Sequence, residues 1–466
     1  MIKFGTDGWR AVISDEFTFE NVRKVAASIA AYLYNHKLNG KPLVIGYDAR
    51  FLADKFAEAV AAVMENAGIN VLLCERDTPT PVTAWEVVDR GAAGAVMLTA
   101  SHNPPQYCGL KFIPDYAGPA TEDITKEIEE KILTPSSLLG HPSPSRGEVE
   151  RIEPRERYFK YIERFLDLEA LRKAKLKIVV DPMYGSGRGY LDKLLERFGC
   201  QTEEIHGFRD VLFGGRNPEP EDQTLSELKM KVKEFNADLG LALDGDADRF
   251  GVVDEAGDFY SANQIISMVF DYLVRDKGYT GGVVRSLATT HMIDAIAQQH
   301  KIKVWETPVG FKHIAQVMMN EEIILGGEES GGFSIKGHIP EKDGILADLL
   351  VAEMVAKAGR PLSKIWEDLV SRVGTYQGRR GKVEVEEEKK RKIMKNLREK
   401  PPQEIEGIKV TKVNTVDGVK MLLEDGSWLL IRPSGTEPLL RIYAESKNSN
   451  SLDKIDQFCY NLIGRK

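Results

Sequence analysis

The sequence predicts an α/β protein with three similar α/β/α mixed-sheet domains, followed by a smaller α+β domain. Three observations support this fold class. Short apolar runs of strand length alternate with helical repeats over most of the chain. This alternation occurs three times, and each time a strand opens into a polar loop. Finally, 466 residues are too many for one hydrophobic core, so several domains are expected.

The first of the three domains ends its central strand in the motif SHNPP at residues 101–105. Strands are predicted at 43–48, 69–74 and 93–99, and helices at 54–67 and 81–90. Strands and helices that alternate in this way are typical of a parallel sheet covered by helices. Because the two prolines prevent both a longer strand and an immediate helix, Ser101 is expected on a rigid loop at the carboxyl end of a strand. His102 beside it could transfer a proton near neutral pH.

The next two domains repeat the pattern after a Pro- and Ser-rich stretch at about 134–150, which suits a linker. The second domain ends in DGDADR at 244–249, and the third in GGEESGG at 326–332. The elements predicted in the second domain are strands at 176–181 and 238–243, and helices at 187–198 and 224–235. Those predicted in the third domain are strands at 282–285, 303–306 and 323–325, and helices at 290–299 and 310–319.

The last part of the chain has a different pattern. A charged helix is predicted at 386–400, and short strands with hairpin signals follow at 417–418 and 425–426. Another strand and a final helix complete a smaller α+β domain. The predicted domain boundaries are 1–145, 151–255, 256–372 and 378–466.

Composition limits the possible partners. Hydrophobic residues make up 42% and charged residues 29% of the chain, as in ordinary globular proteins. A net charge of -8 argues against nucleic acid and anionic membrane surfaces as partners. The four cysteines are scattered, which predicts neither a disulfide framework nor a zinc site and favours a reducing cytoplasm. The N-terminal residues lack an apolar signal region, and no long uncharged run could span a bilayer.

The three carboxylates of DGDADR predict a metal site. Asp244, Asp246 and Asp248 alternate with small residues, and closely spaced carboxylates suit Mg²⁺ better than zinc. An EF-hand is one alternative, since Glu255 lies at its twelfth position, but Arg249 replaces the glycine that it requires at the sixth. A phosphatase with an aspartate nucleophile after a strand is another alternative, which would leave Ser101 and the repeated loops without a role.

Two further loops carry groups that could bind a phosphorylated polyol. Ser434, Gly435 and Thr436 follow Arg432, so hydroxyls and backbone N–H groups lie beside a guanidinium, as phosphate binding requires. Glu328 in the glycine-rich motif, together with Ser330, would suit the recognition of sugar hydroxyls. A simple turn without a function is the alternative for both loops.

Taken together, the motifs resemble those of the α-D-phosphohexomutase superfamily, in its phosphoglucomutase/phosphomannomutase branch. The resemblance covers the whole chain, and five motifs occur in the family's order: FGTDGWR at 4–10, TASHNPP at 99–105, DGDADR at 244–249, GEESGG at 327–332 and RPSGTEP at 432–438. It implies that the four domains surround a central cleft. The loop sequence GEES is similar to that of phosphoglucomutase-like members, whereas phosphoglucosamine mutases usually have GEQS. Gly332 stands where several relatives have histidine.

The resemblance also implies roles for individual residues. Ser101 would carry a phosphoryl group and would bind Mg²⁺ together with Asp244, Asp246 and Asp248. The other catalytic residues implied are Arg10, His102, Lys111 and Arg249. The substrate-binding residues implied are Lys312, Glu328, Ser330, Lys342, Arg432, Ser434, Gly435 and Thr436.

The activity that the resemblance implies is reversible phosphoryl transfer between C1 and C6 of glucose or mannose phosphate. The reaction would pass through hexose 1,6-bisphosphate, which would also act as an activator. A phosphatase, a non-catalytic sugar-phosphate sensor and, within the family, a phosphoglucosamine mutase are the alternatives. The expected partner is therefore a small hexose phosphate, and both a monomer and a homodimer remain possible.

Overall fold

The chain folds into two compact units. One contains Met1–Thr280 and Gly310–Trp366, and the other contains Gly281–Val309 and Glu367–Lys466. The computed structural model describes residues 2–5, 8–132, 146–434 and 438–463. The predicted linker at about 134–150 lies largely outside these residues. The four domain boundaries and the central cleft remain predictions.

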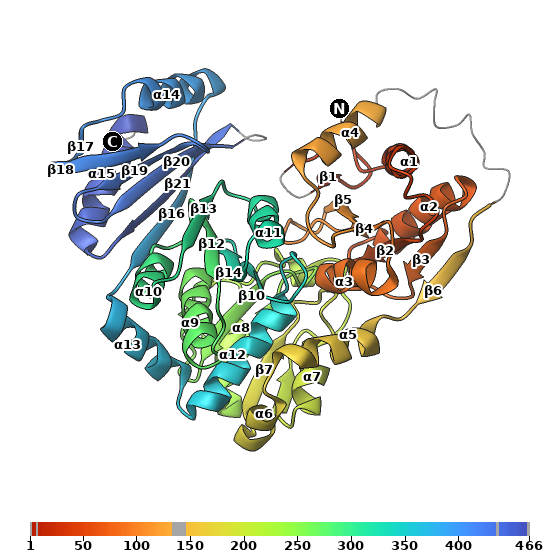
Figure 1. Cartoon of the computed structure of the whole chain (residues 1–466), viewed down its shortest axis with the longest axis horizontal. Coiled ribbons are helices and arrows are strands. Elements are labelled where there is room, and N and C mark those ends of the chain that lie inside the picture. The colour runs from red at the N-terminus through yellow and green to blue at the C-terminus, as the bar shows by residue number, and fades with distance from the viewer. Residues whose placement is uncertain (1, 6–7, 133–145, 435–437, 464–466) are drawn as a thin grey trace. The chain divides into compact units, whose positions relative to one another are not determined.

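The first sheet of the first unit has six strands in the order β1-β5-β4-β2-β3-β6 (Figure 1). These strands are β1 (Trp9–Val12), β2 (Leu43–Tyr47), β3 (Val71–Cys74), β4 (Gly94–Leu98), β5 (Tyr107–Pro114) and β6 (Val149–Ile152). Strands β2, β3, β4 and β6 run parallel, whereas β5 is antiparallel to β4 and β1 is antiparallel to β5. The prediction of a mixed sheet is therefore confirmed here, but β1, β5 and β6 have no counterpart among the predicted strands.

Helices cover both faces of this sheet. The four helices are α1 (Phe19–Asn35), α2 (Ala53–Asn66), α3 (Thr80–Arg90) and α4 (Glu122–Ile132). Apolar side chains of α1, α2 and α4 share one core with alternate strand residues, among them Val96 and Leu98. Helix α3 packs on the other face, where the Thr83 hydroxyl contacts the sulfur of Met97, because neighbouring strand residues point to opposite faces.

The second sheet of this unit has the strand order β11-β10-β9-β7-β8. Its strands are β7 (Lys177–Asp181), β8 (Gln201–Glu204), β9 (Leu239–Leu243), β10 (Phe250–Asp254) and β11 (Phe259–Tyr260). The accompanying helices are α5 (Arg155–Ile162), α6 (Leu168–Ala174), α7 (Leu191–Arg197) and α8 (Ser226–Phe235), with short 3₁₀ turns at Glu163–Phe165 and Phe213–Gly215. Strands β9 and β10 are antiparallel, so the DGDADR motif forms the turn of a hairpin. The strands and helices predicted in this region are confirmed to within a few residues.

A buried helix completes the first unit. Helix α12 (Gly344–Ala358) is buried over most of its length and packs against both β9 and β10. Its N-terminus is capped by Asp343, whose side chain accepts a hydrogen bond from the Leu346 N–H. The other elements are the antiparallel strands β14 (Ile323–Glu328) and β15 (Gly332–Ile335), with helices α9 (Ala262–Arg275) and α11 (Phe311–Asn320).

The second unit is dominated by an antiparallel sheet with the strand order β16-β21-β20-β19-β18-β17. Its strands are β16 (Gln377–Glu384), β17 (Glu404–Ile405), β18 (Ile408–Asn414), β19 (Val419–Leu423), β20 (Trp428–Pro433) and β21 (Leu439–Ser446). Helices α14 (Glu387–Glu399) and α15 (Ser449–Ile463) contribute to one core on the same face. The predicted hairpins at 417–418 and 425–426 are confirmed. This unit also contains the parallel strands β12 (Gly282–Ser286) and β13 (Val304–Thr307), helix α10 (Met292–His300) and the end of α13 (Leu362–Val373).

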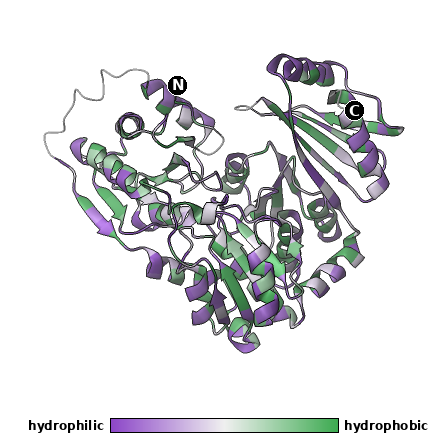
Figure 2. Cartoon of the chain, turned by 180° about the vertical axis from the view of Figure 1, so that it is seen from behind, coloured by the Kyte–Doolittle hydropathy of each residue, from purple (hydrophilic) through white to green (hydrophobic). Residues whose placement is uncertain are grey.

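The hydropathy of the chain follows this arrangement. Strands at the centres of the sheets are coloured as hydrophobic in Figure 2, whereas the surface helix α14 is mostly hydrophilic. The four cysteines are buried, with free thiols. Among the described residues, no helix combines the length and apolar character needed to cross a membrane.

A lysine is buried in the second unit among groups of both charges. Lys420 on β19 is 1% exposed, and its Nζ lies 2.8 Å from Glu306 Oε2 and 2.9 Å from His291 Nε2. Burial, assisted by the cation of Arg285, lowers the pKa of Lys420 to about 8. In the unfolded chain this lysine regains its ordinary pKa of about 10.4. Between these values the unfolded state binds more protons, so the free energy of unfolding should rise with pH.

We expect Lys420→Met to remove this increase. Between pH 8 and 10 the free energy of unfolding of the wild type, relative to the variant, should rise by at most about 1.4 kcal/mol per pH unit. Urea denaturation at several pH values would measure it. Lys412→Met is the matched control, because Lys412 is exposed on the neighbouring strand. Parallel pH profiles of the wild type and Lys420→Met would contradict the prediction.

Candidate active site

Ser101 lies directly after the central strand β4 of the first sheet, as predicted. Its side chain is buried, and its Oγ donates a hydrogen bond to Asp244 Oδ2 at 2.8 Å. His102 Nδ1 lies 3.3 Å from the same Oγ. The backbone of Ser101 has φ +49°, a left-handed conformation that non-glycine residues rarely adopt. The structure therefore places the buried hydroxyl of Ser101, a residue with a strained backbone, against the acidic loop (residues 244–249).

The acidic loop gathers three buried carboxylates. Asp244, Asp246 and Asp248 each offer an oxygen within 4.8 Å of the others. Gly245 allows the close approach of the serine loop (residues 99–107), because a Cβ at this position would lie 2.8 Å from Ser101 O. The chain also turns here through a left-handed residue, Ala247, at φ +58°.

These carboxylates fit a divalent cation. Within the described part of the chain, Asp246 Oδ1 and Asp248 Oδ1 are buried oxygens without a hydrogen-bond partner. A buried acceptor without a partner is costly, so a bound cation would stabilise both oxygens. Hard carboxylate oxygens are the ligands that Mg²⁺ prefers. With Arg249 in place of the EF-hand glycine and a strand before the loop, the geometry differs from that of an EF-hand.

Two lysines lie against the acidic loop. Lys111 Nζ on β5 is 3.1 Å from Asp246 Oδ2 and 3.2 Å from Asp248 Oδ2, and Lys342 Nζ is 2.9 Å from Asp248 Oδ2. Burial alone would raise the pKa of Asp248, but these lysines, with Arg249, hold it well below its usual range. Burial and the charges of Asp246 and Asp248 raise the pKa of Asp244 well above its usual range. The site therefore combines basic side chains with carboxylates whose pKa values are shifted in opposite directions.

The remaining predicted catalytic residues lie around the serine loop. Arg10 Nη1 donates to Asn103 Oδ1 at 2.7 Å, so the side chain of this arginine contacts the serine loop. Arg249 pairs with Glu219 at 3.0 Å. Burial, assisted by the cations of Arg249 and Arg10, holds the pKa of His102 well below its usual value. These surroundings therefore favour the neutral form of the His102 imidazole.

The glycine-rich loop (residues 326–332) joins β14 to β15. Glu328 is the last residue of β14 and is buried, and its Oε1 accepts a hydrogen bond from Ser330 Oγ at 2.6 Å. Burial raises the pKa of Glu328 above its usual value. Lys312 at the start of α11 pairs with Glu122 at 2.9 Å. The predicted contact between Lys312 and a substrate phosphate remains a prediction.

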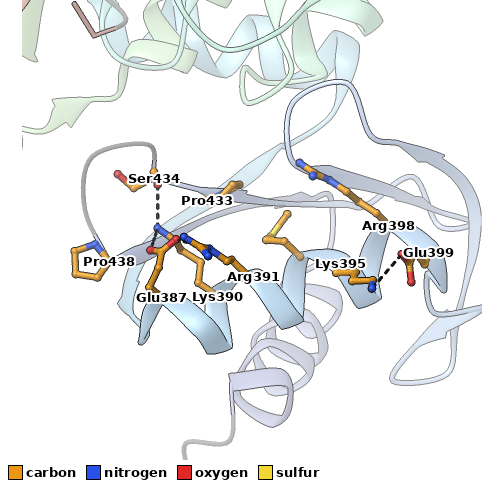
Figure 3. A pocket seen from close by; sticks show the side chains of 10 residues that line it. Glu387, Lys390, Arg391, Lys395, Arg398, Glu399, Pro433, Ser434 and Pro438 are labelled. Atoms are coloured by element: carbon orange, nitrogen blue, oxygen red, sulfur yellow. Dashed lines mark hydrogen bonds and ion pairs between the residues drawn. The ribbon is translucent and has the colours of Figure 1, made fainter. Parts of the chain in front are cut away.

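The predicted phosphate-binding loop, which follows Arg432, belongs to the second unit. Arg432 Nη2 lies 2.8 Å from Asp417 Oδ2. Ser434 lines a cavity of about 790 Å³ together with basic side chains of α14 (Figure 3). Lys390 Nζ donates to Ser434 O at 3.2 Å, which holds Ser434 against this helix. Gly435 and Thr436 lie outside the described residues.

Residues that contact the site and are missing from the prediction include Arg50, Thr80 and Thr99. Thr80 begins α3, and its Oγ1 donates to Asp246 Oδ2 at 2.6 Å while its N–H donates to Asp246 O at 2.9 Å. The signal that could have identified Thr80 is its place after β3. Like the serine loop, the segment after β3 leaves the carboxyl edge of the sheet, where ligands bind in α/β proteins.

Comparison with known proteins gives matches along the whole chain. Models of the phosphoglucomutase/phosphomannomutase α/β/α domains I, II and III match residues 1–138, 156–257 and 261–373. The model of the C-terminal domain matches residues 382–462. Three α/β/α domains followed by a C-terminal domain with an antiparallel sheet are thereby confirmed.

Individual relatives match over nearly their full length. A phosphoglucomutase/phosphomannomutase of Thermococcus kodakarensis is 31% identical over 96% of this chain and 94% of its own. A probable phosphoglucosamine mutase of Methanosphaera stadtmanae is 33% identical over 99% of this chain and 98% of its own. The crystal structure of a protein assigned as a phosphomannomutase from Thermus thermophilus has a TM-score of 0.86 and 34% identity, and the match covers 99% of both chains.

Proposed function

The chain belongs to the phosphoglucomutase/phosphomannomutase family of the α-D-phosphohexomutase superfamily, and we propose that it interconverts hexose 1-phosphate and hexose 6-phosphate. The reaction passes through phosphorylated Ser101 and a hexose 1,6-bisphosphate. One observation carries this proposal: the buried Ser101 Oγ lies 2.8 Å from Asp244 Oδ2, in an acidic loop whose three carboxylates could hold a cation. Phosphoryl transfer requires chiefly this combination of positioning and charge stabilisation.

In each half-reaction a phosphoryl group moves between Ser101 Oγ and a sugar hydroxyl. In the first half-reaction the P–O bond to the serine breaks as a P–O bond to the sugar forms, and a base takes the proton of the sugar hydroxyl. In the second, the other phosphoryl group of the bisphosphate returns to Ser101 Oγ, and the base gives the proton to the sugar oxygen that this group leaves. His102 and Lys111 are the two candidates for this base, which contributes about 10²- to 10⁴-fold. Arg249 and Arg10 would stabilise the negative charge that develops on the phosphoryl oxygens.

The metal has a defined place in this proposal. Asp244, Asp246, Asp248 and phosphorylated Ser101 would hold Mg²⁺. When bound, the ion supplies positive charge next to the phosphoryl oxygens. The two orphaned carboxylate oxygens of the acidic loop support this assignment.

The other predicted residues would bind the substrate. Glu328 and Ser330 are proposed to bind two neighbouring sugar hydroxyls, with O3 and O4 as the pair that the family resemblance suggests. Glucose and mannose carry both hydroxyls in the same orientation, so we propose that the enzyme accepts both sugars. The residues proposed to bind phosphate are Lys312, Lys342, Arg432, Ser434, Gly435 and Thr436.

A mutase assay distinguishes this proposal from a phosphatase and from a non-catalytic sensor. Glucose 1-phosphate should give glucose 6-phosphate without release of inorganic phosphate, and glucose 1,6-bisphosphate should activate the reaction. Release of phosphate would indicate a phosphatase, and no turnover would indicate a sensor. Comparing kcat/KM for glucose, mannose and glucosamine 1-phosphates tests the sugar. Glucosamine phosphate is the second candidate, because the relative from Methanosphaera stadtmanae bears that name. A cytoplasmic location remains a prediction.

We expect Glu328→Ala to lower kcat/KM for glucose and mannose 1-phosphates alike by about 10- to 100-fold, because a hydrogen bond to a charged group is lost in a buried site. Phosphorylation of Ser101 from glucose 1,6-bisphosphate should still reach one phosphoryl group per chain. Steady-state kinetics on both sugars, together with intact mass, would measure the two effects.

Glu321→Ala is the matched control, because Glu321 is an exposed glutamate just before the same strand. It should leave both kcat/KM values unchanged. A loss of activity on mannose phosphate alone would mean that Glu328 contacts the substrate near C2, where the two sugars differ, and would overturn the assignment to O3 and O4.

A further inference from the structure

One arginine, Arg50, holds the serine loop through hydrogen bonds to its main chain. Arg50 follows strand β2 and is fully buried. Its guanidinium donates a hydrogen bond to Asp48 Oδ2 and to four main-chain carbonyl oxygens of the serine loop. The acceptors are Ser101 O at 2.6 Å, Asn103 O at 2.6 Å, Pro104 O at 2.8 Å and Tyr107 O at 2.9 Å, with Asp48 Oδ2 at 3.1 Å.

The five N–H groups of the guanidinium are thus all used. Four carbonyl dipoles that converge in a buried space repel one another unless a cation lies between them. Lysine could not replace arginine here, because an ammonium is a point charge with three donors and lacks the planar fork. The ring of Phe213 covers the guanidinium at 5.0 Å, which keeps the cluster dry.

A second chain of hydrogen bonds holds the other side of Ser101. The Ser101 N–H donates to Thr99 Oγ1 at 2.8 Å, and Thr99 Oγ1 donates to Asp48 Oδ2 at 2.6 Å. Asp48 in turn accepts from Arg50, both from its backbone N–H and from its Nε. Both the N–H and the carbonyl oxygen of Ser101 are therefore fixed by one buried network. We call Asp48, Arg50 and Thr99 the loop clamp.

The loop clamp accounts for the strained backbone of Ser101. A serine at φ +49° is in a sparsely populated conformation, which persists only when the surroundings determine it. If the clamp were released, Ser101 could return to an ordinary conformation, and its Oγ would turn away from Asp244. The loop clamp thus links a buried arginine to the position of the reacting oxygen.

We propose that Arg50 is a positioning residue of the phosphoryl-transfer site, which acts by holding Ser101 in its left-handed conformation through the main chain of the serine loop. This inference rests on the proposed function. Arg50 is placed behind the loop and acts only through other residues. Its loss should therefore lower the rate of phosphoryl transfer without weakening the binding of the sugar phosphate.

The test is Arg50→Lys, which keeps the charge but not the fork. We expect kcat for glucose 1-phosphate to fall by about 100-fold, the effect of displacing a reacting group by about 1 Å, while KM is unchanged. Hydrogen exchange at the Ser101 amide should become faster, since the loop is no longer held. Thr99→Val offers a milder second variant, which removes the acceptor of the Ser101 N–H with little change in volume. It should lower kcat in the same direction, again at constant KM.

Arg285→Lys is the matched control. Like Arg50, Arg285 is a buried arginine whose guanidinium is held by several acceptors. These acceptors are the carboxylates of Asp294 and Glu306 and the carbonyl oxygen of Ser286, and none of them belongs to the serine loop. It should lose thermal stability without losing kcat. An unchanged kcat in Arg50→Lys, or an equal fall of kcat in Arg285→Lys, would overturn the proposal. If Arg50→Lys does not fold, Thr99→Val alone decides.

The exchange measurement keeps this inference separate from the proposed function. If the wild type shows no mutase activity but the Ser101 amide is protected, and that protection is lost in Arg50→Lys, the proposed function fails and the loop clamp stands. If the wild type is an active mutase and neither kcat nor exchange responds to Arg50→Lys, the loop clamp fails and the proposed function stands.

Discussion

Replacing Ser101 by alanine should lower kcat for the conversion of glucose 1-phosphate to glucose 6-phosphate by about 10⁴-fold or more, because the variant has no oxygen to carry the phosphoryl group. The variant should still fold, since the loop is held through the main-chain atoms of Ser101, which alanine retains. The free energy of unfolding should fall by about 1 to 3 kcal/mol, because the buried Asp244 Oδ2 loses the hydrogen bond from the serine hydroxyl. A coupled assay for glucose 6-phosphate measures the loss of activity. Intact mass after incubation with glucose 1,6-bisphosphate should show one phosphoryl group on the wild type and none on the variant.

The matched control for this experiment is Ser28→Ala. Ser28 is a buried serine of the same domain, on helix α1, and its hydroxyl donates only to the carbonyl oxygen of Lys24. This variant should be phosphorylated and active like the wild type. Full mutase activity in Ser101→Ala, or a phosphoryl group that maps to a different residue, would refute the role of Ser101 as the phosphorylated nucleophile.

The positions of the reactive groups could be predicted because each follows a recognisable strand. Ser101, Asp244 and Glu328 lie at or just after the ends of β4, β9 and β14, where short apolar runs stop at polar residues. A buried strand leaves a clear pattern, and the carboxyl edge of an α/β sheet is where ligands bind. The chemistry of the three loops is therefore visible before any contact between them is known.

The groups that hold these reactive residues could not be predicted in the same way. Arg50 is 51 residues from Ser101 in sequence, and Thr80 is 166 residues from Asp246. Arg50 bonds to main-chain carbonyl oxygens, which every residue possesses, so no side-chain pattern in the serine loop specifies such a partner. Strand β5 escaped prediction for a related reason. It is antiparallel to β4 and follows the proline-containing loop directly, without the helix that separates parallel strands.

The distribution of charge around the acidic loop could not be predicted from the sequence alone either. Three neighbouring aspartates indicate a cation, but the sequence does not show that Lys111 and Lys342 converge on Asp248. These lysines neutralise part of the negative charge of the acidic loop. A metal held by the acidic loop would bind through oxygens that the lysines leave open, and Asp246 Oδ1 and Asp248 Oδ1 are of this kind.

The second large effect should come from Asp246→Asn. The substitution removes one negative charge from the acidic loop and leaves an uncharged amide beside Lys111 and Thr80, which both contact Oδ2 of the native side chain. Mutation of a group that only supports a metal ligand typically costs about 10- to 100-fold in affinity. Loss of a ligand's charge should cost at least as much, so we expect Mg²⁺ affinity to fall by about 100-fold and kcat to fall strongly at subsaturating metal. Isothermal titration with Mg²⁺ and activity measured against Mg²⁺ concentration would quantify both losses.

Asp258→Asn is the matched control, since Asp258 is an exposed aspartate in the turn between β10 and β11 of the same sheet. It removes the same charge but should leave metal affinity and kcat unchanged. Treatment of the wild type with a chelator should abolish activity, and Mg²⁺ should restore it. The cation offsets the repulsion between the three carboxylates and stabilises the negative charge of the reacting phosphoryl group. Full activity of chelator-treated protein would mean that the acidic loop binds no essential metal. An Asp246→Asn variant with wild-type metal affinity would mean that Asp246 is not a ligand of the metal.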